Sequence, residues 1–152
     1  MNFDGSLLAA GLHSVLPRET TVLEILKSVE PDDELIATCR DLHQLGYAIA
    51  LDDFAGHPHL EPLTRIATVI KVDLWRTTKT EQERLLKTYR PRGIAMLAEK
   101  VETSAEFDWA RRAGYDYFQG YFFARPTVLR GHQIPASKSI AYACFAKCSR
   151  RI

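Results

Sequence analysis

Residues 48–54 read Ala-Ile-Ala-Leu-Asp-Asp-Phe, four apolar residues that run directly into two adjacent carboxylates. An uninterrupted apolar run is typical of a strand buried on both faces of a parallel sheet. Two acids at the end of such a strand are costly unless they meet water, a basic group or a metal ion. One interpretation makes Asp52 the cap of the next helix and leaves Asp53 in solvent. The other places both aspartates in a functional site, because active sites lie at the carboxyl ends of the strands in parallel barrels.

The composition describes a globular chain of 152 residues that is 46% hydrophobic and carries a net charge of +1. This hydrophobic fraction argues against disorder, and the small net charge argues against binding to a nucleic-acid polymer. No apolar run approaches the roughly 18 residues of a membrane span, and the N-terminus lacks a signal-peptide pattern. Three cysteines, Cys39, Cys144 and Cys148, fit reduced and mostly buried thiols. We therefore expect a cytoplasmic protein that does not associate with membranes.

Strand and helix patterns alternate along the whole chain. Residues 1–4 resemble the end of a strand, and further strands are predicted at residues 21–26, 48–51, 69–73, 94–99 and 115–121. Helical patterns lie between them, at residues 7–15, 31–45, 60–66, 80–89 and 103–113, with a last helix at residues 137–151.

Capping signals place the starts of several of these helices. Asp32 opens one helix with negative charge in its first turn, and Leu45 belongs to the apolar face of that helix. Thr80 with Glu83, and Thr103 with Glu106, have the spacing of a capping box.

The predicted strands also share a polar residue at or near the carboxyl end. Glu24, Asp52, Lys71, Glu99 and Gln119 follow one another at intervals of 28, 19, 28 and 20 residues. One strand-helix unit of a (β/α)8 barrel averages about 31 residues, so these polar groups recur roughly once per unit. The fold class is therefore α/β, a TIM-like (β/α)8 barrel in which the polar strand ends converge on one mouth.

The converging set is rich in oxygen ligands and consists of Asn2, Glu24, Asp52, Asp53, Lys71, Glu99 and Gln119. Carboxylate and amide oxygens suit Mg²⁺ or Mn²⁺, and adjacent aspartates can bridge two ions that act on a phosphodiester. Simpler interpretations remain open at this stage. Lys71 could pair with Asp73 or Glu99 inside the barrel, Glu99 could be a buried ion-pair partner, and Gln119 could be a satisfied core amide.

Four motifs in the order and spacing of one family carry a resemblance. They are Asp52-Asp53-Phe54, Ile70-Lys71-Val72-Asp73, Ala98-Glu99-Lys100-Val101-Glu102-Thr103 and Gln119-Gly120-Tyr121-Phe122. The chain resembles the EAL domain, the (β/α)8-barrel family of bacterial cyclic di-GMP phosphodiesterases. Finer features, including Leu23-Glu24-Ile25 and Ile134-Pro135, are similar to the branch in which an EAL-like domain precedes an HDOD domain.

The resemblance implies roles for individual residues. The implied metal ligands are Asn2, Glu24, Asp52, Asp53 and Glu99, which would hold Mg²⁺ or Mn²⁺. The implied catalytic residues are Lys71, Glu99 and Asp53, with Lys71 near the attacking water. The implied substrate-binding residues are Gln119, Tyr121 and Arg125, although an aromatic run such as 121–123 is also typical of a buried core.

Departures from the family pattern bear on activity. The chain is expected to begin after the strand that carries the Glu-Ala-Leu signature, which makes the barrel incomplete. Lys27 stands where active members place a second glutamate, Lys100 replaces a glycine, and residues 54–59 lack the usual glycine-threonine-glycine loop. A cation beside the metal site would compete with the ions.

The sequence therefore favours a degenerate, non-catalytic cyclic di-GMP signalling domain that senses the nucleotide or binds a protein. The alternatives are a working Mg²⁺- or Mn²⁺-dependent phosphodiesterase that yields linear pGpG, and a barrel remnant that binds nothing. Residues 1–130 are expected to form the partial barrel, and residues 131–152 a C-terminal helix or linker. Open sheet edges predict a protein partner or self-association, against which a monodisperse monomer at low salt would count.

Overall fold

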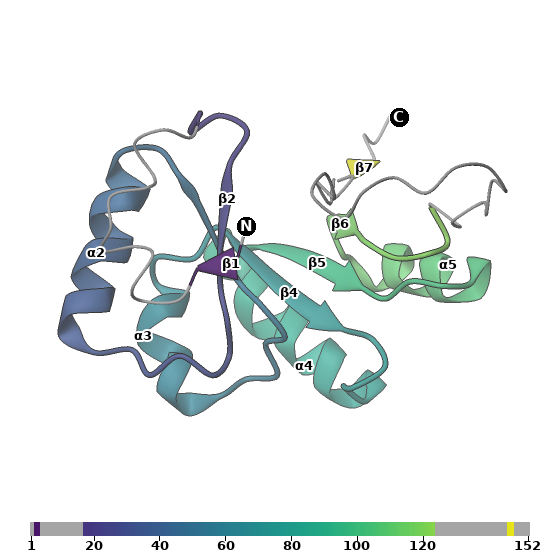
Figure 1. The fold of residues 1–152 in the computed structure, drawn as a ribbon. Helices are drawn as coiled ribbons and strands as arrows, with labels where there is room; N and C mark the ends of the chain where they lie inside the picture. The colour runs from purple at the N-terminus through teal and green to yellow at the C-terminus, as the bar shows by residue number, and fades with distance from the viewer. Residues whose placement is uncertain (1, 4–16, 124–145, 148–152) are drawn as a thin grey trace, which may run out of the picture.

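A curved, mainly parallel sheet forms the centre of the computed structural model, which describes residues 2–3, 17–123 and 146–147 (Figure 1). In this part of the chain the strand order follows the sequence, and every neighbouring pair is parallel except the last. The strands are β1 (Asn2–Phe3), β2 (Val22–Ile25), β3 (Ala48–Leu51), β4 (Val69–Asp73), β5 (Ala95–Glu99), β6 (Tyr117–Phe118) and β7 (Ala146–Lys147). Sequential parallel strands joined by helices make this an incomplete α/β barrel.

Helices connect the strands and follow one another around the outside of the sheet (Figure 1). They are α2 (Asp33–Gln44), α3 (Glu61–Thr64), α4 (Lys79–Tyr89) and α5 (Ser104–Ala113), with the 3₁₀ turns η2 (Pro58–Leu60) and η3 (Arg90–Arg92). Asp32 caps α2 by accepting a hydrogen bond from the backbone of Leu35, as its sequence position predicts. Within the described segments, no helix is both long and apolar enough to cross a lipid bilayer.

The two faces of each strand have different roles, because side chains alternate along a strand. Ile49, Leu51, Ile70 and Val72 face the helices and are at most 1% exposed. They belong to one core with residues of α2, α4 and α5, including Cys39, which is a buried free thiol as predicted. The opposite face carries the strand-end polar residues, so the same alternation that builds the core also directs these residues to one side.

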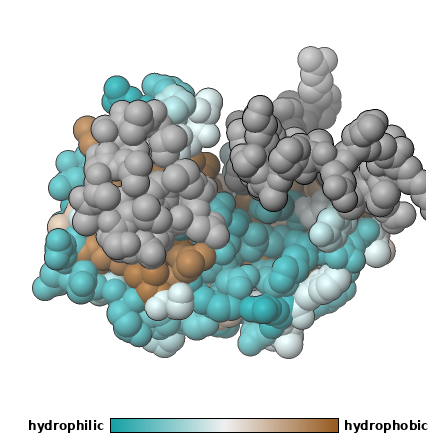
Figure 2. All heavy atoms as spheres, viewed as in Figure 1, coloured by the Kyte–Doolittle hydropathy of each residue, from teal (hydrophilic) through white to brown (hydrophobic). Residues whose placement is uncertain are grey.

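The surface outside this core is predominantly hydrophilic over the described residues in the view of Figure 2. Leu45 is an exception to the predicted pattern, because it is 51% exposed rather than part of the apolar face of α2. It forms the C-cap of that helix, beyond the last turn that packs on the sheet.

The capping box of α4 lies two residues earlier than the predicted pair Thr80 and Glu83. Thr78 accepts from the backbone of Glu81, and the Glu81 carboxylate accepts from the backbone N–H of Thr78. The sequence contains two overlapping Thr-x-x-Glu patterns, and the buried Gln82 decides between them. Its amide donates to the carbonyl of Thr77, which fixes the turn before the helix. The second predicted box, Thr103 with Glu106, is confirmed.

The C-terminal helix predicted at residues 137–151 is wrong for Ala146 and Lys147, which form β7 and pair antiparallel with β6. The backbone of β6 offers hydrogen-bonding groups at its free side, and β7 satisfies them. The other residues of that predicted helix, and the helical stripe predicted at residues 7–15, lie outside the described residues. The strand predicted at residues 115–121 is shorter in the structure, because residues 121–123 form a turn.

Candidate functional site

A buried lysine in the middle of β4 gathers three of the predicted site residues. Lys71 Nζ lies 2.6 Å from Asp52 Oδ1, 2.9 Å from Glu99 Oε1 and 3.2 Å from Glu24 Oε2. The lysine is only 5% exposed. Strands β2, β4 and β5, and the residue directly after β3, thus each contribute one charged side chain to a cluster that we call the Lys71 hub (Lys71, Glu24, Asp52 and Glu99).

The charges of the hub stabilise one another. Burial by itself lowers the pKa of the Lys71 ammonium, but the hydrogen bond to Asp52 and the charges of Glu99 and Glu24 outweigh burial and raise the pKa. Burial raises the pKa of the Glu99 carboxyl, and Lys71 offsets only part of this shift. Lys71 therefore remains protonated. The expected ion pair of Lys71 with Glu99 is present, and Lys71 also pairs with Glu24 and Asp52.

Asp52 does not cap a helix, because its carboxylate binds Lys71 and the next helical segment begins at Pro58. Asp53 does not stay alone in solvent either. Its Oδ2 lies 2.8 Å from Lys27 Nζ and 3.3 Å from Arg76 Nη1. The backbone of Asp53 has a φ of 50°, a left-handed conformation that is uncommon outside glycine. This conformation directs the two adjacent carboxylates to different partners.

Asp73 organises a second group of charges, at the end of β4. Its carboxylate is ion-paired with Lys100 and lies 3.6 Å from Arg76 Nε. Burial would raise the pKa of Asp73, but Lys100 and the backbone N–H groups of Trp75 and Arg76 lower it. The predicted alternative partner of Lys71 thus pairs with Lys100 instead. Lys100 has a φ of 57°, at the position where the sequence resemblance implies a glycine.

Arg76 joins these contacts into one chain of alternating charge, Lys27–Asp53–Arg76–Asp73–Lys100. We call it the mouth ion-pair chain, because it connects the segments that follow β2, β3, β4 and β5. With the Lys71 hub it brings five carboxylates together with four cations. The protein's own side chains therefore neutralise nearly all of the negative charge that a metal ion would otherwise neutralise.

The donor set has the right chemistry for Mg²⁺ or Mn²⁺, but its arrangement does not fit a metal ion. Among the residues that the structure describes, no three His, Cys, Asp or Glu side chains are placed to hold one ion. Asp52, Glu24 and Glu99 point their oxygens at Lys71, and Asp53 points its own at Lys27 and Arg76. Four of the five expected metal ligands are thus brought together, but around cations.

The remaining predicted residues are placed in different ways. Asn2 pairs in register with Glu24 across β1 and β2. Gln119 donates its backbone N–H to Ala98, while its buried side-chain Oε1 lacks a partner among the described residues, so it is not a satisfied core amide. Tyr121 is 61% exposed, which contradicts the expectation of a core aromatic. Arg125 lies outside the described residues.

The exposed aromatics after β6 result from the short strand. Phe122 and Phe123 are 37% and 40% exposed, and both pack against Phe107 of α5. In a turn, consecutive side chains do not alternate between two buried faces as they would in a strand. The interpretation of residues 121–123 as core is therefore wrong.

Sequence reasoning missed two site residues, Trp75 and Arg76. They lie two and three residues after Asp73, in the segment that leaves the carboxyl end of β4. A signal was available, because segments at this end of every strand face the same mouth. The predicted site residues came mostly from the motifs, and Arg76 lies outside these motifs.

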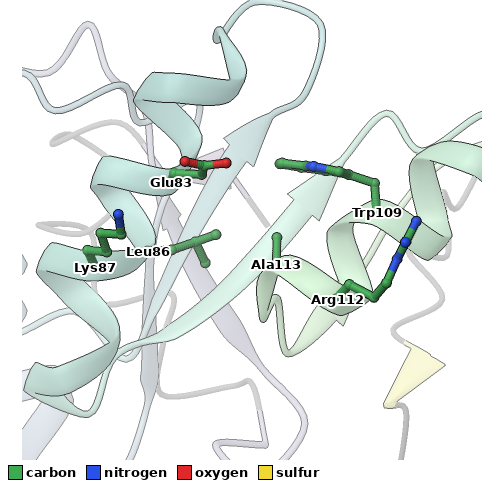
Figure 3. A pocket seen from close by; sticks show the side chains of 6 residues that line it. All are labelled: Glu83, Leu86, Lys87, Trp109, Arg112 and Ala113. Atoms are coloured by element: carbon green, nitrogen blue, oxygen red, sulfur yellow. The ribbon is translucent and has the colours of Figure 1, made fainter.

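The structure has one cavity at this site and another in its helical layer. One of about 420 Å³ lies on the inner face of the sheet and is lined by Glu24, Ala50, Lys71, Leu97 and Tyr117, among others. The other, of about 390 Å³, lies between α4 and α5 (Figure 3). There the Trp109 ring reaches from α5 toward Glu83 of α4. The first cavity is continuous with the Lys71 hub, whereas the second belongs to the outer, helical layer.

Curated relatives resemble this chain over most of its length. It is 39% identical to the Uncharacterized protein YuxH of Bacillus subtilis over 139 residues, which are 88% of this chain and 34% of that protein. It is 36% identical to the Cyclic di-GMP phosphodiesterase CdgJ of Vibrio cholerae over 150 residues, 95% of this chain and 34% of that protein. The chain thus spans about a third of the length of these relatives.

Solved structures resemble the fold as well. The manganese and cyclic di-GMP complex of Klebsiella pneumoniae BlrP1 matches with a TM-score of 0.59 and 28% identity, over 78% of this chain and 33% of that one. A family model described as the EAL domain matches residues 6–126. These residues include the Lys71 hub and the mouth ion-pair chain. The chain belongs to the EAL domain family.

Proposed function

We propose that this chain is a cyclic di-GMP signalling domain that binds the nucleotide without hydrolysing it. Two comparisons support the ligand, since CdgJ is named a cyclic di-GMP phosphodiesterase and BlrP1 was solved with cyclic di-GMP. Both proteins are similar to this chain over most of its length. The absence of turnover is argued from the site itself.

The observation that carries the proposal is the contact between Lys27 Nζ and Asp53 Oδ2 at 2.8 Å. Lys27 takes the place where the family resemblance puts a glutamate. A divalent ion bound by Asp53 would lie within a few ångströms of this ammonium. A double and a single positive charge 4 Å apart repel by roughly 8 kcal/mol in a medium of effective dielectric constant 20. The ion would first have to displace Lys27.

The other cations of the site act in the same direction. Arg76 holds Asp53 from a second side, and Lys100 holds Asp73. Their side chains are 63% and 47% exposed, so solvent weakens each single contact. Together with Lys27 they leave the aspartate pair with little net charge to attract Mg²⁺ or Mn²⁺.

A phosphodiesterase is the second candidate, and the Lys71 hub is the observation that favours it. Asp52, Lys71 and Glu99 lie together near the strand ends, and Asp53 is the next residue after Asp52 in the sequence. If a metal ion displaced the cations, the carboxylates of Asp52, Asp53 and Glu99 would be available as ligands. The proposal predicts that this exchange does not occur at millimolar metal.

The test is to incubate the purified chain with cyclic di-GMP and Mn²⁺ or Mg²⁺ and to separate cyclic from linear dinucleotide by chromatography. We expect the cyclic form to remain and to be retained by the protein. Linear product from the wild type, lost in Asp52→Asn, would establish the phosphodiesterase instead. If the protein neither retains the nucleotide nor yields linear product, the barrel does not bind this ligand and the proposal is overturned.

A further inference from the structure

A further cavity, of about 590 Å³, lies between α2 and the segment formed by η2 and α3. These elements are neighbours in the helical layer outside the sheet (Figure 1). The cavity shares no residue with the Lys71 hub or the mouth ion-pair chain. Its volume lies within the roughly 300–1,000 Å³ of small-molecule sites in proteins, so the chemistry of its walls indicates which ligand it fits.

Two guanidinium groups line this cavity from separate elements. Arg40 lies on α2, one helical turn after Ile36, and Arg65 is the C-cap of α3. Both arginines are exposed, and within the described part of the chain neither side chain forms an ion pair or a hydrogen bond. A lone exposed arginine needs no ligand, but two that line the same cavity give it a double positive charge and ten N–H donors.

Glu61 is the carboxylate among the described residues that line the cavity, and both of its oxygens are already bound. Its Oε1 lies 2.9 Å from Arg92 Nη1, and its Oε2 accepts from the Tyr89 hydroxyl at 3.0 Å. The charge of Glu61 is therefore paired outside the set of lining cations. The charges of Arg40 and Arg65 remain for a ligand.

We propose that the α2–α3 cavity binds a small phosphate monoester through Arg40 and Arg65. Such an ester carries about 1.5 to 2 negative charges at pH 7, which match two guanidinium groups better than the single charge of a carboxylate or a phosphodiester. Its organic part would lie against the apolar lining residues, which are Ile36, Pro58, Pro62 and Ile66. The cavity is separate from the strand ends, so this inference goes beyond the proposed function and does not rest on it.

Phenyl phosphate is the probe, because it joins a doubly charged phosphate to a flat apolar ring. Calorimetry of the purified chain compares it with benzenesulfonate, which has the same ring and a single charge, and with inorganic phosphate, which has no ring. We expect both to bind about tenfold more weakly than phenyl phosphate, since each lacks one part of the match. Amide resonances of α2 and α3 should shift on binding, and those of the strand ends should not.

The double variant Arg40→Gln/Arg65→Gln removes the two lining charges and should bind phenyl phosphate at least about tenfold more weakly. The matched control is Arg111→Gln/Arg112→Gln, which loses the same two charges on the exposed side of α5. Its affinity should stay within about threefold of wild type, because screened surface charges at that distance contribute little. Circular dichroism confirms that both variants fold.

Several results would overturn the site and leave the proposed function intact. They are the absence of saturable binding by the wild type at about 10 mM phenyl phosphate, equal weakening in both double variants, and equal affinity for benzenesulfonate. Equal affinity for inorganic phosphate would overturn the ester as the ligand. Selective loss of phenyl phosphate binding in Arg40→Gln/Arg65→Gln, with shifts confined to α2 and α3, supports the site.

Discussion

The ammonium of Lys27 lies 2.8 Å from Asp53 Oδ2, so a positive side chain holds a carboxylate that the sequence resemblance implies as a metal ligand. On the far side of the site Lys100 holds Asp73 in the same way. Both cations stand where the sequence resemblance implies a residue without positive charge. The site is thus organised by internal ion pairs.

Replacing these two cations should create a metal site. The double variant Lys27→Glu/Lys100→Gly lowers the net charge of the site by three and frees Asp53 and Asp73. We expect its affinity for Mn²⁺ to rise at least about tenfold over wild type, as each additional charge nearby contributes on the order of 1 kcal/mol or more. Titration with Mn²⁺ alone, followed by electron paramagnetic resonance, measures this affinity.

Lys87→Glu is the matched control for Lys27→Glu, since it makes the same change of two charges at an exposed position of α4 away from the strand ends. It should leave Mn²⁺ affinity as in wild type. Equal Mn²⁺ binding by the wild type and the double variant would show that Lys27 and Lys100 do not obstruct the metal ligands.

Removing the ammonium at the centre of the hub should destabilise the fold. Lys71→Met leaves Glu24, Asp52 and Glu99 crowded and partly buried without a cation. Breaking a buried ion pair at one partner costs about 3–5 kcal/mol, and we expect a loss of free energy of unfolding in this range at pH 7. Urea denaturation measures it, and Lys71→Arg should lose less. A loss below about 1 kcal/mol would contradict the assignment of Lys71 as the organising cation.

The fold and the position of the site could be predicted from the sequence because both depend on local patterns. The alternation of apolar residues in 69–73 identifies a two-faced strand, and it places Lys71 and Asp73 on the same side. The recurrence of polar strand ends then brings Glu24, Asp52 and Glu99 to Lys71, as the structure shows.

The partners within the site could not be predicted, because they depend on distances between loops. Asp73 binds Lys100 rather than Lys71, and Arg76 bridges Asp53 and Asp73. These contacts join residues 23 to 27 positions apart or lie within one loop, and no periodicity encodes them. The capping box at Thr78 was missed for a different reason, since two overlapping patterns have the same local chemistry.

Asp73 should make stability depend on pH in the acidic range. Its pKa is lowered from the ordinary value of 3.8 by Lys100 and two backbone N–H groups, against the effect of burial. A carboxylate whose pKa is lowered in the folded state stabilises the fold at any pH above its pKa in the unfolded state. This contribution disappears as the pH falls through the lowered pKa of the folded state. Asp73→Asn should therefore lose about 2–4 kcal/mol at pH 7 and progressively less below about pH 4.

Urea denaturation of the wild type and Asp73→Asn at pH 7, 5, 4 and 3 tests this dependence. The difference between the two proteins should stay constant from pH 7 to 5 and shrink toward pH 3. A difference that does not change with pH would mean that the charge of Asp73 does not contribute to stability.

Thr78 and Thr80 offer a test of where α4 begins. The Thr78 side chain accepts from the backbone of Glu81, so Thr78→Ala should cost about 1 kcal/mol of unfolding free energy. Thr80 is exposed inside the first turn, and Thr80→Ala should change stability by less than about 0.5 kcal/mol. A larger loss at Thr80 than at Thr78 would move the start of the helix to the later pattern.

In the proposed function, the internal cations leave a site that binds cyclic di-GMP without turning it over. Its most direct test is a calorimetric titration with cyclic di-GMP in excess Mn²⁺ and again in EDTA, after which the nucleotide is recovered from the cell and separated by chromatography. We predict the same affinity within about threefold in both buffers, and cyclic nucleotide recovered intact from both. Binding that requires Mn²⁺, with linear dinucleotide recovered, would contradict the account.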